Sequence, residues 1–179
     1  LIAARSARET AAMGFPGFGI GGLSVGEGRE EMLAALRAAM SELPEDRPVH
    51  LMGVGTPLDI VDCAAEGVDL FDCVLPTRNA RHGGVMTWEG PLRIAAAEHE
   101  ADPRPLSEQC DCPACRQGLS RAYLRHLFRT KEPLGWQLLT LHNLRFYTQL
   151  MARVREAIAA DELAELRAQV SSWSERDRR

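Results

Sequence analysis

The chain has 179 residues, of which 45% are hydrophobic and 26% charged, a composition typical of a folded globular protein and not of a disordered one. Its formal net charge of −4 argues against a surface that binds nucleic acid non-specifically throughout, although it permits a local basic patch. No apolar run approaches the roughly 18 residues of a membrane-spanning helix and no signal peptide opens the chain, so we expect no membrane or secreted protein. Because residues 1–8 lack an initial Met and read as the middle of a helix, we expect a truncated larger protein.

The first part of the chain alternates between strand and helix patterns. We predict helices over residues 1–13, 29–42 and 58–66, and strands over residues 18–20, 50–55 and 68–74. Thr56 and Pro57 have the types that begin a helix, with Pro at the first helical position. Strands that alternate with helices favour a parallel sheet with right-handed crossovers, which is an α/β fold.

The second part breaks this alternation. We predict two short antiparallel strands within residues 83–94, and helices over residues 120–130 and 138–160. On the last helix, apolar spacing predicts one buried face, made of Leu141, Leu144, Tyr147, Leu150, Met151, Val154 and Ile158. Residues 171–179 are charged, and we expect them to fray.

Three of the five cysteines crowd into residues 110–115, with the pattern Cys-x-Cys-x-x-Cys. Without a secretory signal, such a cluster indicates a metal site before a disulfide, and it favours a cytosolic protein. Cys110, Cys112 and Cys115 supply three thiolates, and His142 on the long helix completes a tetrahedral zinc site. Such a closed site has no position for water, so we predict one structural zinc ion. The alternatives are three buried thiols and a core histidine.

Candidate catalytic residues stand where the predicted strands end, because parallel α/β barrels gather reactive groups at the carboxyl ends of their strands. These positions carry the pair Gly21-Gly22, Met52 and Asp72. A carboxylate beside an apolar strand is costly to bury unless it is hydrogen-bonded or functional, so Asp72 is a catalytic candidate. Its alternative role is to tie down the following loop. The glycine pair opens main-chain amides to a ligand, or simply makes a tight turn near Glu27.

The other candidates have equally plain alternatives. Met52 fits a hydrophobic core, although a methionine at a strand end also stacks on a flat base. Arg78 and Arg81 are three residues apart and could hold two phosphates, or lie on a solvated loop with surface ion pairs.

Five motifs together resemble the tRNA-guanine transglycosylases, also called queuine tRNA-ribosyltransferases. In order along the chain they are residues 21–27 (GGLSVGE), 51–57 (LMGVGTP), 71–78 (FDCVLPTR), 110–115 (CDCPAC) and 138–144 (LLTLHNL). The resemblance implies the C-terminal part of a TIM (β/α)8 barrel with an inserted zinc-binding subdomain. It divides the chain into the last βα units of the barrel (1–82), the zinc-binding subdomain (83–137), the final barrel helix (138–165) and a charged tail (166–179).

The resemblance also implies a reaction, in which guanine at the tRNA wobble position is exchanged for a 7-deazaguanine base. Asp72 matches the nucleophile, which attacks the ribose anomeric carbon and forms a covalent ribosyl-enzyme. The matching base-binding residues are Gly22, Leu23, Glu27 and Met52, and the tRNA-binding residues are Thr77, Arg78 and Arg81. Val25 matches bacterial members that accept 7-aminomethyl-7-deazaguanine, because its branched side chain narrows the pocket against queuine. The family further implies a homodimer of the full-length enzyme in the cytoplasm.

Two departures from the family pattern stand out. His82 replaces the Asn that is more common there, which affects the detail of the RNA contact. The N-terminal half of the family, with half of the barrel strands and the carboxylate that recognises guanine, is absent from this sequence, so we expect the chain alone to be inactive. The alternative function is a zinc-stabilised, non-catalytic module that binds tRNA or a partner subunit. The presence of Asp72 favours the enzyme, because a non-catalytic homologue would be free to lose it.

Overall fold

The computed structural model describes residues 2–23 and 26–176, with side chains up to residue 173. The chain divides into two compact units, Leu1–Val74 and Leu75–Arg179. The division predicted from the sequence, with limits after residues 82, 137 and 165, remains a prediction. Among the described helices, none combines the length and the apolar character that crossing a membrane requires.

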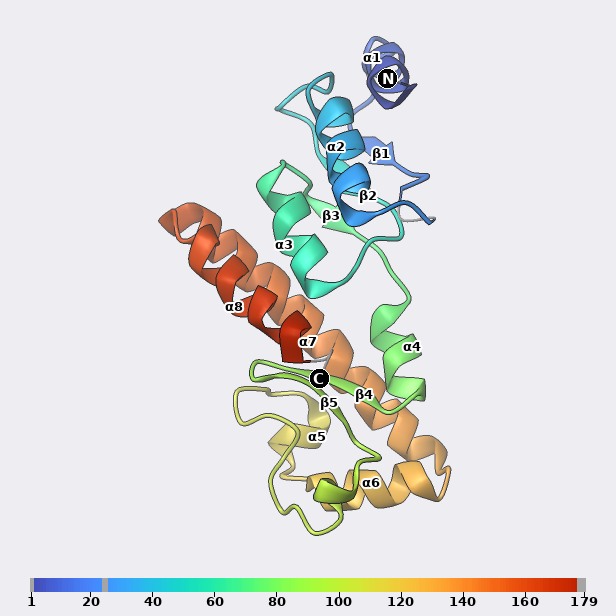
Figure 1. Cartoon of the computed structure of the whole chain (residues 1–179), viewed down its shortest axis with the longest axis vertical. Coiled ribbons are helices and arrows are strands. Elements are labelled where there is room, and N and C mark those ends of the chain that lie inside the picture. The colour runs from blue at the N-terminus through green and yellow to red at the C-terminus, as the bar shows by residue number, and fades with distance from the viewer. Residues whose placement is uncertain (1, 24–25, 177–179) are drawn as a thin grey trace. The chain divides into compact units, whose positions relative to one another are not determined.

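The first unit is a parallel sheet with helical connections (Figure 1). Its elements are α1 (Ile2–Ala11), β1 (Phe18–Ile20), α2 (Arg29–Met40), β2 (Val49–Leu51), α3 (Pro57–Ala65) and β3 (Leu70–Phe71). The strand order is β1-β2-β3, and both neighbouring pairs are parallel. The predicted mixed α/β fold with a parallel sheet is therefore confirmed, whereas the complete barrel stays a prediction. The second and third strands are shorter than predicted.

Local sequence explains how the helices of this unit begin and meet. The Thr56 hydroxyl accepts a hydrogen bond from the Asp59 amide at 3.2 Å, and Pro57 occupies the first turn of α3, as predicted. Arg29 at the start of α2 pairs with Asp59 at 2.8 Å and also with Asp62, so one guanidinium joins the two helices. Beneath them lies an apolar cluster of buried residues, namely Met32, Leu33, Leu36, Leu51, Val54, Cys63 and Val68.

The two faces of this sheet have different surroundings. Leu51 on β2 is fully buried in the cluster that also contains residues of α2 and α3. Side chains alternate along a strand, so its neighbour His50 lies on the opposite face. In the parallel register His50 is aligned with Leu70, whose exposed fraction is 56%. The face that carries His50 and Leu70 is thus turned away from the helices.

In the second unit, the other elements pack around one long helix. Its elements are α4 (Leu75–Arg81), β4 (Gly84–Thr87), β5 (Gly90–Arg93), the 3-10 helix η1 (Ala97–His99), α5 (Pro113–Arg116), α6 (Arg121–Arg129), α7 (Pro133–Ala160) and α8 (Leu163–Arg176). Strands β4 and β5 form the predicted antiparallel pair. The helices predicted over 120–130 and 138–160 are present as α6 and α7, and α7 begins earlier, at Pro133.

The buried face of α7 differs from the predicted one. The prediction is wrong for three residues of the face, because Leu141, Leu144 and Ile158 are exposed. Instead, the buried set includes Gly135, Leu138, Leu139, His142, Asn143, Phe146, Leu150 and Val154. Asn143 is buried because its polar groups are satisfied: its amide nitrogen donates to the carbonyls of Pro76 and Gly84, and its oxygen accepts from the Met86 amide, each at 3.0 Å.

The C-terminal segment is a helix and not a frayed tail. Residues 171–176 belong to α8, which contradicts the expectation for this stretch, and residues 177–179 lie outside the described residues. Trp173 explains the difference, because its ring packs at centroid distances of 5.9 Å from both Trp88 and Phe146. Burial of this large aromatic side chain orders the last helix.

Candidate functional site

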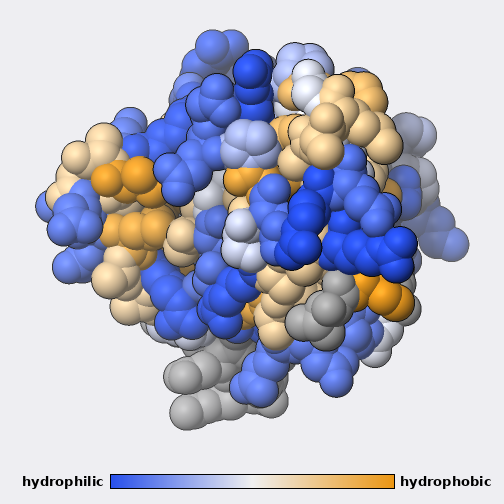
Figure 2. All heavy atoms as spheres, turned by 90° about the horizontal axis from the view of Figure 1, so that it is seen from above, coloured by the Kyte–Doolittle hydropathy of each residue, from blue (hydrophilic) through white to orange (hydrophobic). Residues whose placement is uncertain are grey.

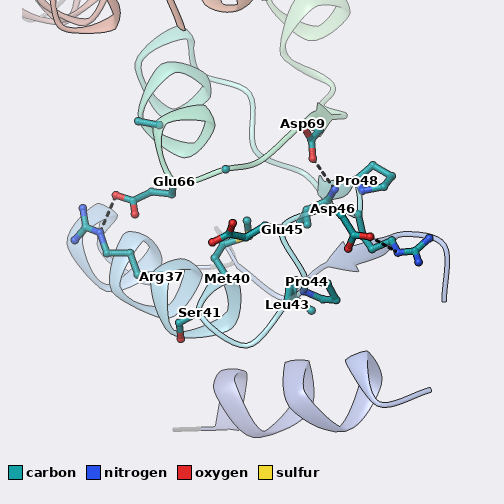
Figure 3. Close-up of a pocket in the computed structure, with 14 residues that line it drawn as sticks. Arg37, Met40, Ser41, Leu43, Pro44, Glu45, Asp46, Pro48, Glu66 and Asp69 are labelled. Carbon is teal, nitrogen blue, oxygen red and sulfur yellow. Dashed lines mark hydrogen bonds and ion pairs between the residues drawn. The ribbon is translucent and has the colours of Figure 1, made fainter. Parts of the chain in front are cut away.

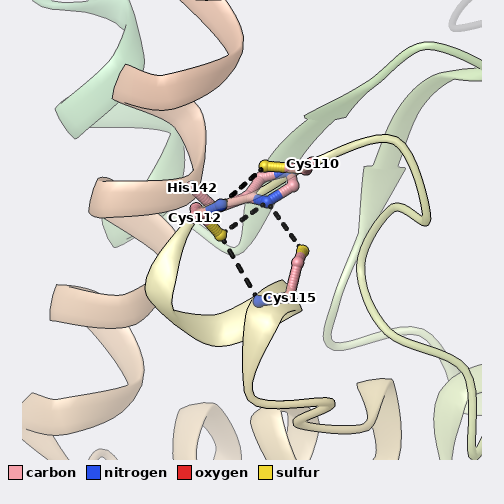
Figure 4. A group of neighbouring side chains, drawn as sticks. All are labelled: Cys110, Cys112, Cys115 and His142. Atoms are coloured by element: carbon pink, nitrogen blue, oxygen red, sulfur yellow. Dashed lines mark hydrogen bonds between the residues drawn. The ribbon is translucent and has the colours of Figure 1, made fainter.

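The cysteines of the second unit converge with a histidine. The ligand atoms of Cys110, Cys112, Cys115 and His142 all lie within 4.8 Å of one another (Figure 4). His142 Nδ1 lies 3.4 Å from the sulfurs of both Cys112 and Cys115. Tetrahedral zinc, with bonds of about 2.3 Å to sulfur and about 2.0 Å to nitrogen, would hold these atoms about 3.5 Å apart. The four residues therefore fit the group that sequence spacing predicted.

Backbone and helix positions build this cluster. Cys112 is the N-cap of α5, where its sulfur accepts a hydrogen bond from the Cys115 amide at 3.5 Å, and Pro113 follows in the first turn. The Cys112 amide in turn donates to the Cys110 sulfur at 3.4 Å. A tight turn with such N–H donors favours thiolates, which are the metal-binding form of cysteine.

His142 is oriented by a contact on its other ring nitrogen. A carbonyl oxygen only accepts hydrogen bonds, so His142 Nε2 donates to the Met86 carbonyl at 2.8 Å. In the neutral ring, which is the form that binds a metal, Nδ1 then presents its lone pair to the sulfurs. Metal-binding histidines usually have such an outer partner, so this contact supports ligation over simple packing in the core.

The pKa values of the cluster residues also favour the binding of a cation. Hydrogen bonds with Cys110 and Cys115 hold the pKa of the Cys112 thiol well below its usual value. Contacts with Cys110 and Cys112 instead raise the pKa of Cys115, because a second thiolate beside the first is unfavourable. Burial opposes the charged form of His142, yet hydrogen bonds with Cys110 and Cys112 prevail and raise its pKa to about 9. Only a bound cation would let all three sulfurs ionise together.

A salt bridge and two side-chain hydrogen bonds hold the segments next to the cluster. The carboxylate of Asp111 accepts hydrogen bonds from two nitrogens of Arg145 on α7. Arg121 on α6 donates to the carbonyls of Pro105 and Leu106 at 2.9 Å, which fixes the loop that leads to the cysteines. These contacts pre-shape the loop for the cluster.

In the first unit, Asp72 directly follows β3, at its carboxyl end. Its Oδ1 accepts a hydrogen bond from His50 Nε2 at 2.9 Å and one from the Gly53 amide at 3.3 Å. Gly53 has a φ of 75°, a conformation that favours glycine, and this turn directs its amide toward the carboxylate. The Asp72 side chain is 62% exposed, so it is accessible to a reactant.

Met52 lies at the same edge of the sheet, after β2. Its exposed fraction is 44%, which makes it a surface residue of this unit and not a core residue. A side chain on Gly21 would come within 2.6 Å of the Met52 terminal methyl group, so the bare backbone of Gly21 lets the methionine reach the end of β1. The adjacent Gly22 has a φ of 75°, which also favours glycine.

The remaining base-site candidates stand in the loop between β1 and α2. Leu23 packs partly buried against the apolar cluster under α2 and α3. Glu27 is half-buried and immediately precedes Gly28, the N-cap of α2. Val25 lies outside the described residues. The structure therefore brings Gly22, Met52 and Asp72 to the carboxyl edge of one sheet.

Two residues that the sequence pattern did not predict contact Asp72 or the residue after it. His50 was missed because its contact depends on strand register, which the sequence pattern alone does not define. Gly55 was missed because a lone glycine has many uses. A Cβ atom on Gly55 would lie 1.9 Å from the sulfur of Cys73, the residue after Asp72, so only glycine lets these two segments approach.

The predicted tRNA-binding residues lie on a helix that the sequence reading did not foresee. Thr77, Arg78 and Arg81 belong to α4, and both arginines are exposed in its last turn. A three-residue spacing on a helix places two side chains on one side, so the pair presents two positive charges together. His82 Nδ1 donates to the Arg78 carbonyl at 2.8 Å, which extends the end of this helix.

A large hollow of the first unit, of about 800 Å³, lies at the other end of the strands (Figure 3). It includes Val49, which begins β2, and Asp69, which precedes β3 and accepts a hydrogen bond from the Val49 amide at 2.8 Å. Arg37 and Glu66 form an ion pair across it at 2.7 Å. Ligands of parallel sheets bind at the carboxyl ends, so the candidate reactive edge is the one with Met52 and Asp72.

Comparison with known proteins points to one family. A family model described as queuine tRNA-ribosyltransferase matches residues 2–175. The chain is 54% identical over 163 residues to the queuine tRNA-ribosyltransferase of Desulforamulus reducens, covering 91% of this chain and 44% of that protein. Those of Novosphingobium aromaticivorans (55% over 152 residues, 85% and 40% covered) and Neisseria meningitidis serogroup A (56% over 155 residues, 87% and 42% covered) are similar to it as well. The chain thus spans less than half the length of these relatives.

Proposed function

The chain belongs to the queuine tRNA-ribosyltransferase family, and from this we propose that it is the C-terminal portion of a tRNA-guanine transglycosylase. The enzyme would exchange guanine at the tRNA wobble position for a 7-deazaguanine base. The observation that carries this proposal is Asp72, an accessible carboxylate at the carboxyl end of β3 with one oxygen held by two donors.

In the proposed mechanism Asp72 is the nucleophile. Its second oxygen, Oδ2, attacks the ribose anomeric carbon while the bond from that carbon to the guanine nitrogen breaks, and the electron pair leaves with guanine. The incoming base then attacks the same carbon through its ring nitrogen and releases the Asp72 carboxylate, so the configuration is retained as in double-displacement glycosidases. The ring nitrogen of the incoming base gives its proton to solvent in this step, and the departed guanine takes up one proton from solvent. The target nucleotide must leave its stack so that the anomeric carbon becomes accessible.

The neighbouring residues would bind the two substrates. We assign the backbone of Gly22 and Leu23 to the base, with Glu27 steadying their loop and Met52 stacking on the ring. Thr77, Arg78 and Arg81 would contact tRNA phosphates, which suits the paired arginines on α4.

We propose 7-aminomethyl-7-deazaguanine as the incoming base, because Val25 would narrow the pocket against the larger queuine. An oversized group typically costs ~1 to 3 kcal/mol, so the expected preference is strong but not absolute. Equal incorporation of both bases in a competition assay with the complete enzyme would rule out Val25 as the gate.

The metal cluster has a structural part in this proposal. Cys110, Cys112, Cys115 and His142 would hold one zinc ion, which joins the cysteine loop and α5 to α7. Four protein ligands leave no open position, so zinc would supply folding stability and no step of the reaction. A homodimer of the complete enzyme in the cytoplasm belongs to the same proposal.

A zinc-stabilised module that binds tRNA or a subunit without chemistry is the alternative function. The metal cluster and the exposed arginines of α4 would serve such a module equally well. The hydrogen-bonded carboxylate of Asp72 favours the enzyme, because a binding module has no use for an oriented nucleophile.

The test is the substitution Asp72→Asn in the complete enzyme, measured as incorporation of labelled guanine into tRNA. We expect exchange to fall at least about a thousandfold, because the amide is not a nucleophile, while the tRNA Kd stays within about twofold. Asp46→Asn is the matched control, since Asp46 is exposed and, among the residues that the structure describes, forms an ion pair only with Arg47, at 3.6 Å. Retained exchange in Asp72→Asn would contradict the proposal and leave the binding module as the better function.

A further inference from the structure

His50 and Asp72 meet across two neighbouring strands. The register aligns His50 with Leu70, and Asp72 is two residues further along, so all three side chains point to the same face of the sheet. This diagonal spacing is within reach of a long side chain such as histidine. His50 Nε2 accordingly lies 2.9 Å from Asp72 Oδ1.

The two oxygens of Asp72 are not equivalent. Oδ1 accepts from both His50 Nε2 and the Gly53 amide, whereas Oδ2 has no hydrogen bond within the part of the chain that the structure describes. The carboxylate torsion is broad and nearly two-fold in a free side chain. Two donors on one oxygen select one orientation and leave the other oxygen to react.

The contact also defines the state of the imidazole. A carboxylate has only acceptor atoms, so the proton of the contact is on His50 Nε2. His50 therefore acts as a donor here. A role as the base that removes a proton from a substrate would need that nitrogen unprotonated.

We propose that His50 is a positioning residue for the reaction, a role that rests on Asp72 being the nucleophile. Its Nε2–H holds Oδ1 so that Oδ2 faces the anomeric carbon. In the covalent intermediate Oδ1 becomes the carbonyl oxygen of the ester, and the same donor remains on it. When the incoming base attacks, negative charge returns to the carboxylate, and the His50 hydrogen bond stabilises it as a leaving group. No proton leaves His50 in either step.

Simple packing explains His50 less well. Its side chain is 38% exposed and lies on the face opposite the buried apolar cluster, so it contributes little to the core. Replacing it should therefore change the orientation of Asp72 more than the folding of the unit.

The test compares two substitutions in the complete enzyme. His50→Leu keeps much of the volume without a donor, and His50→Gln places an amide N–H near the position of Nε2. We expect His50→Leu to lower kcat about 10- to 100-fold with KM for tRNA within about twofold, because misplacement of a reacting group acts on the chemical step. His50→Gln should remain within about fivefold of the unsubstituted enzyme. His126→Leu, on the exposed side of α6, is the matched control and should not change kcat.

The outcomes separate the two proposals. Unchanged kcat in His50→Leu, or equal losses in His50→Leu and His50→Gln, would overturn the positioning role while Asp72 remains the nucleophile. Exchange that persists in Asp72→Asn, assayed in parallel, would overturn the proposed function and the role of His50 with it.

A spectroscopic measurement tests the same contact without turnover. Long-range proton–nitrogen correlation spectra of the complete enzyme distinguish the two neutral forms of the His50 ring. We expect the proton on Nε2, and Asp72→Ala should shift the ring toward a mixture of both forms because the acceptor is lost. A proton found on Nδ1 of the unsubstituted protein would contradict the contact on which the proposal stands.

Discussion

Cys63 and Cys112 show how position decides the chemistry of a residue type. Burial raises the pKa of Cys63 to about 12, so it stays a neutral thiol within the apolar cluster. Cys112 instead receives hydrogen bonds at the start of α5 and lies 3.4 Å from His142 Nδ1. Compared with Cys63, Cys112 therefore has the surroundings of a metal ligand.

The zinc content of the chain tests this difference. We expect one zinc per chain, and we expect Cys112→Ala to lose most of it, whereas Cys63→Ala should keep it. Protons compete with the metal for thiolates, so zinc should be retained at neutral pH and released as the pH falls. Metal analysis of the purified unsubstituted chain and of both variants, at neutral and at lower pH, measures these zinc contents. Full zinc content in Cys112→Ala would contradict the assigned ligand set.

Sequence spacing predicted the cysteine cluster but not the residues that contact Asp72 and Cys73. The cysteines are close in sequence and a zinc ligand set has few alternatives, so their spacing alone identified Cys110, Cys112 and Cys115. His50 and Gly55 carry no such local signal. Their contacts with Asp72 and Cys73 depend on how β2 and β3 are aligned, which only the folded sheet determines.

At the scale of elements, α7 and α8 show why composition misled the sequence reading. Leu144 is hydrophobic but exposed, while Asn143 is polar but buried, with its side-chain nitrogen and oxygen both hydrogen-bonded. The charges of α8 suggested a loose tail. Yet Leu166, Val170 and Trp173 repeat at helical spacing and are buried, a signal that the sequence did contain.

Trp173→Ala measures the contribution of α8. Removal of a buried Trp side chain typically costs about 3 to 5 kcal/mol, so we expect a loss of this size in the free energy of unfolding of the zinc-loaded protein. Leu144→Ala is the control, because its side chain is 43% exposed and should cost less than about 1 kcal/mol. Urea unfolding followed by circular dichroism provides both values. Equal costs would mean that α8 does not pack as described.

At the scale of the whole molecule, the sheet of the first unit has two edges. β1 and β3 each pair only with β2 among the described strands. A closed barrel would remove such edges, and its interior would cover the face that carries His50, Leu70 and Asp72.

Figure 2 shows hydrophobic side chains, in orange, between hydrophilic ones on the face it views. Exposed apolar residues of this unit include Ile2, Met13, Phe15, Met52 and Leu70.

The isolated chain should therefore bind zinc without catalysing base exchange. Its Asp72 is in place, but the proposed reaction also needs groups that recognise guanine, and these are expected in the remaining part of the enzyme. The check is labelled-guanine incorporation by the purified 179-residue chain beside the complete enzyme. Turnover by the chain alone would show that these groups are not required.

The α/β class and the parallel sheet were readable from the sequence, because the alternation of strands and helices is a local pattern. The lengths of β2 and β3 were not readable in this way. After β2 the backbone turns at Gly53, which has a φ of 75°, and β3 ends at Phe71, directly before Asp72. The strands end at the residues that would form the base site.

The most direct measurement is the site of covalent attachment in the complete enzyme. Incubation with a tRNA anticodon stem-loop without an incoming base should accumulate the ribosyl-enzyme, and digestion followed by tandem mass spectrometry locates the modified residue. The proposed mechanism predicts attachment to Asp72 alone, with no adduct in Asp72→Asn. An adduct on any other residue, or one that persists in Asp72→Asn, would contradict the assignment of Asp72 as the nucleophile.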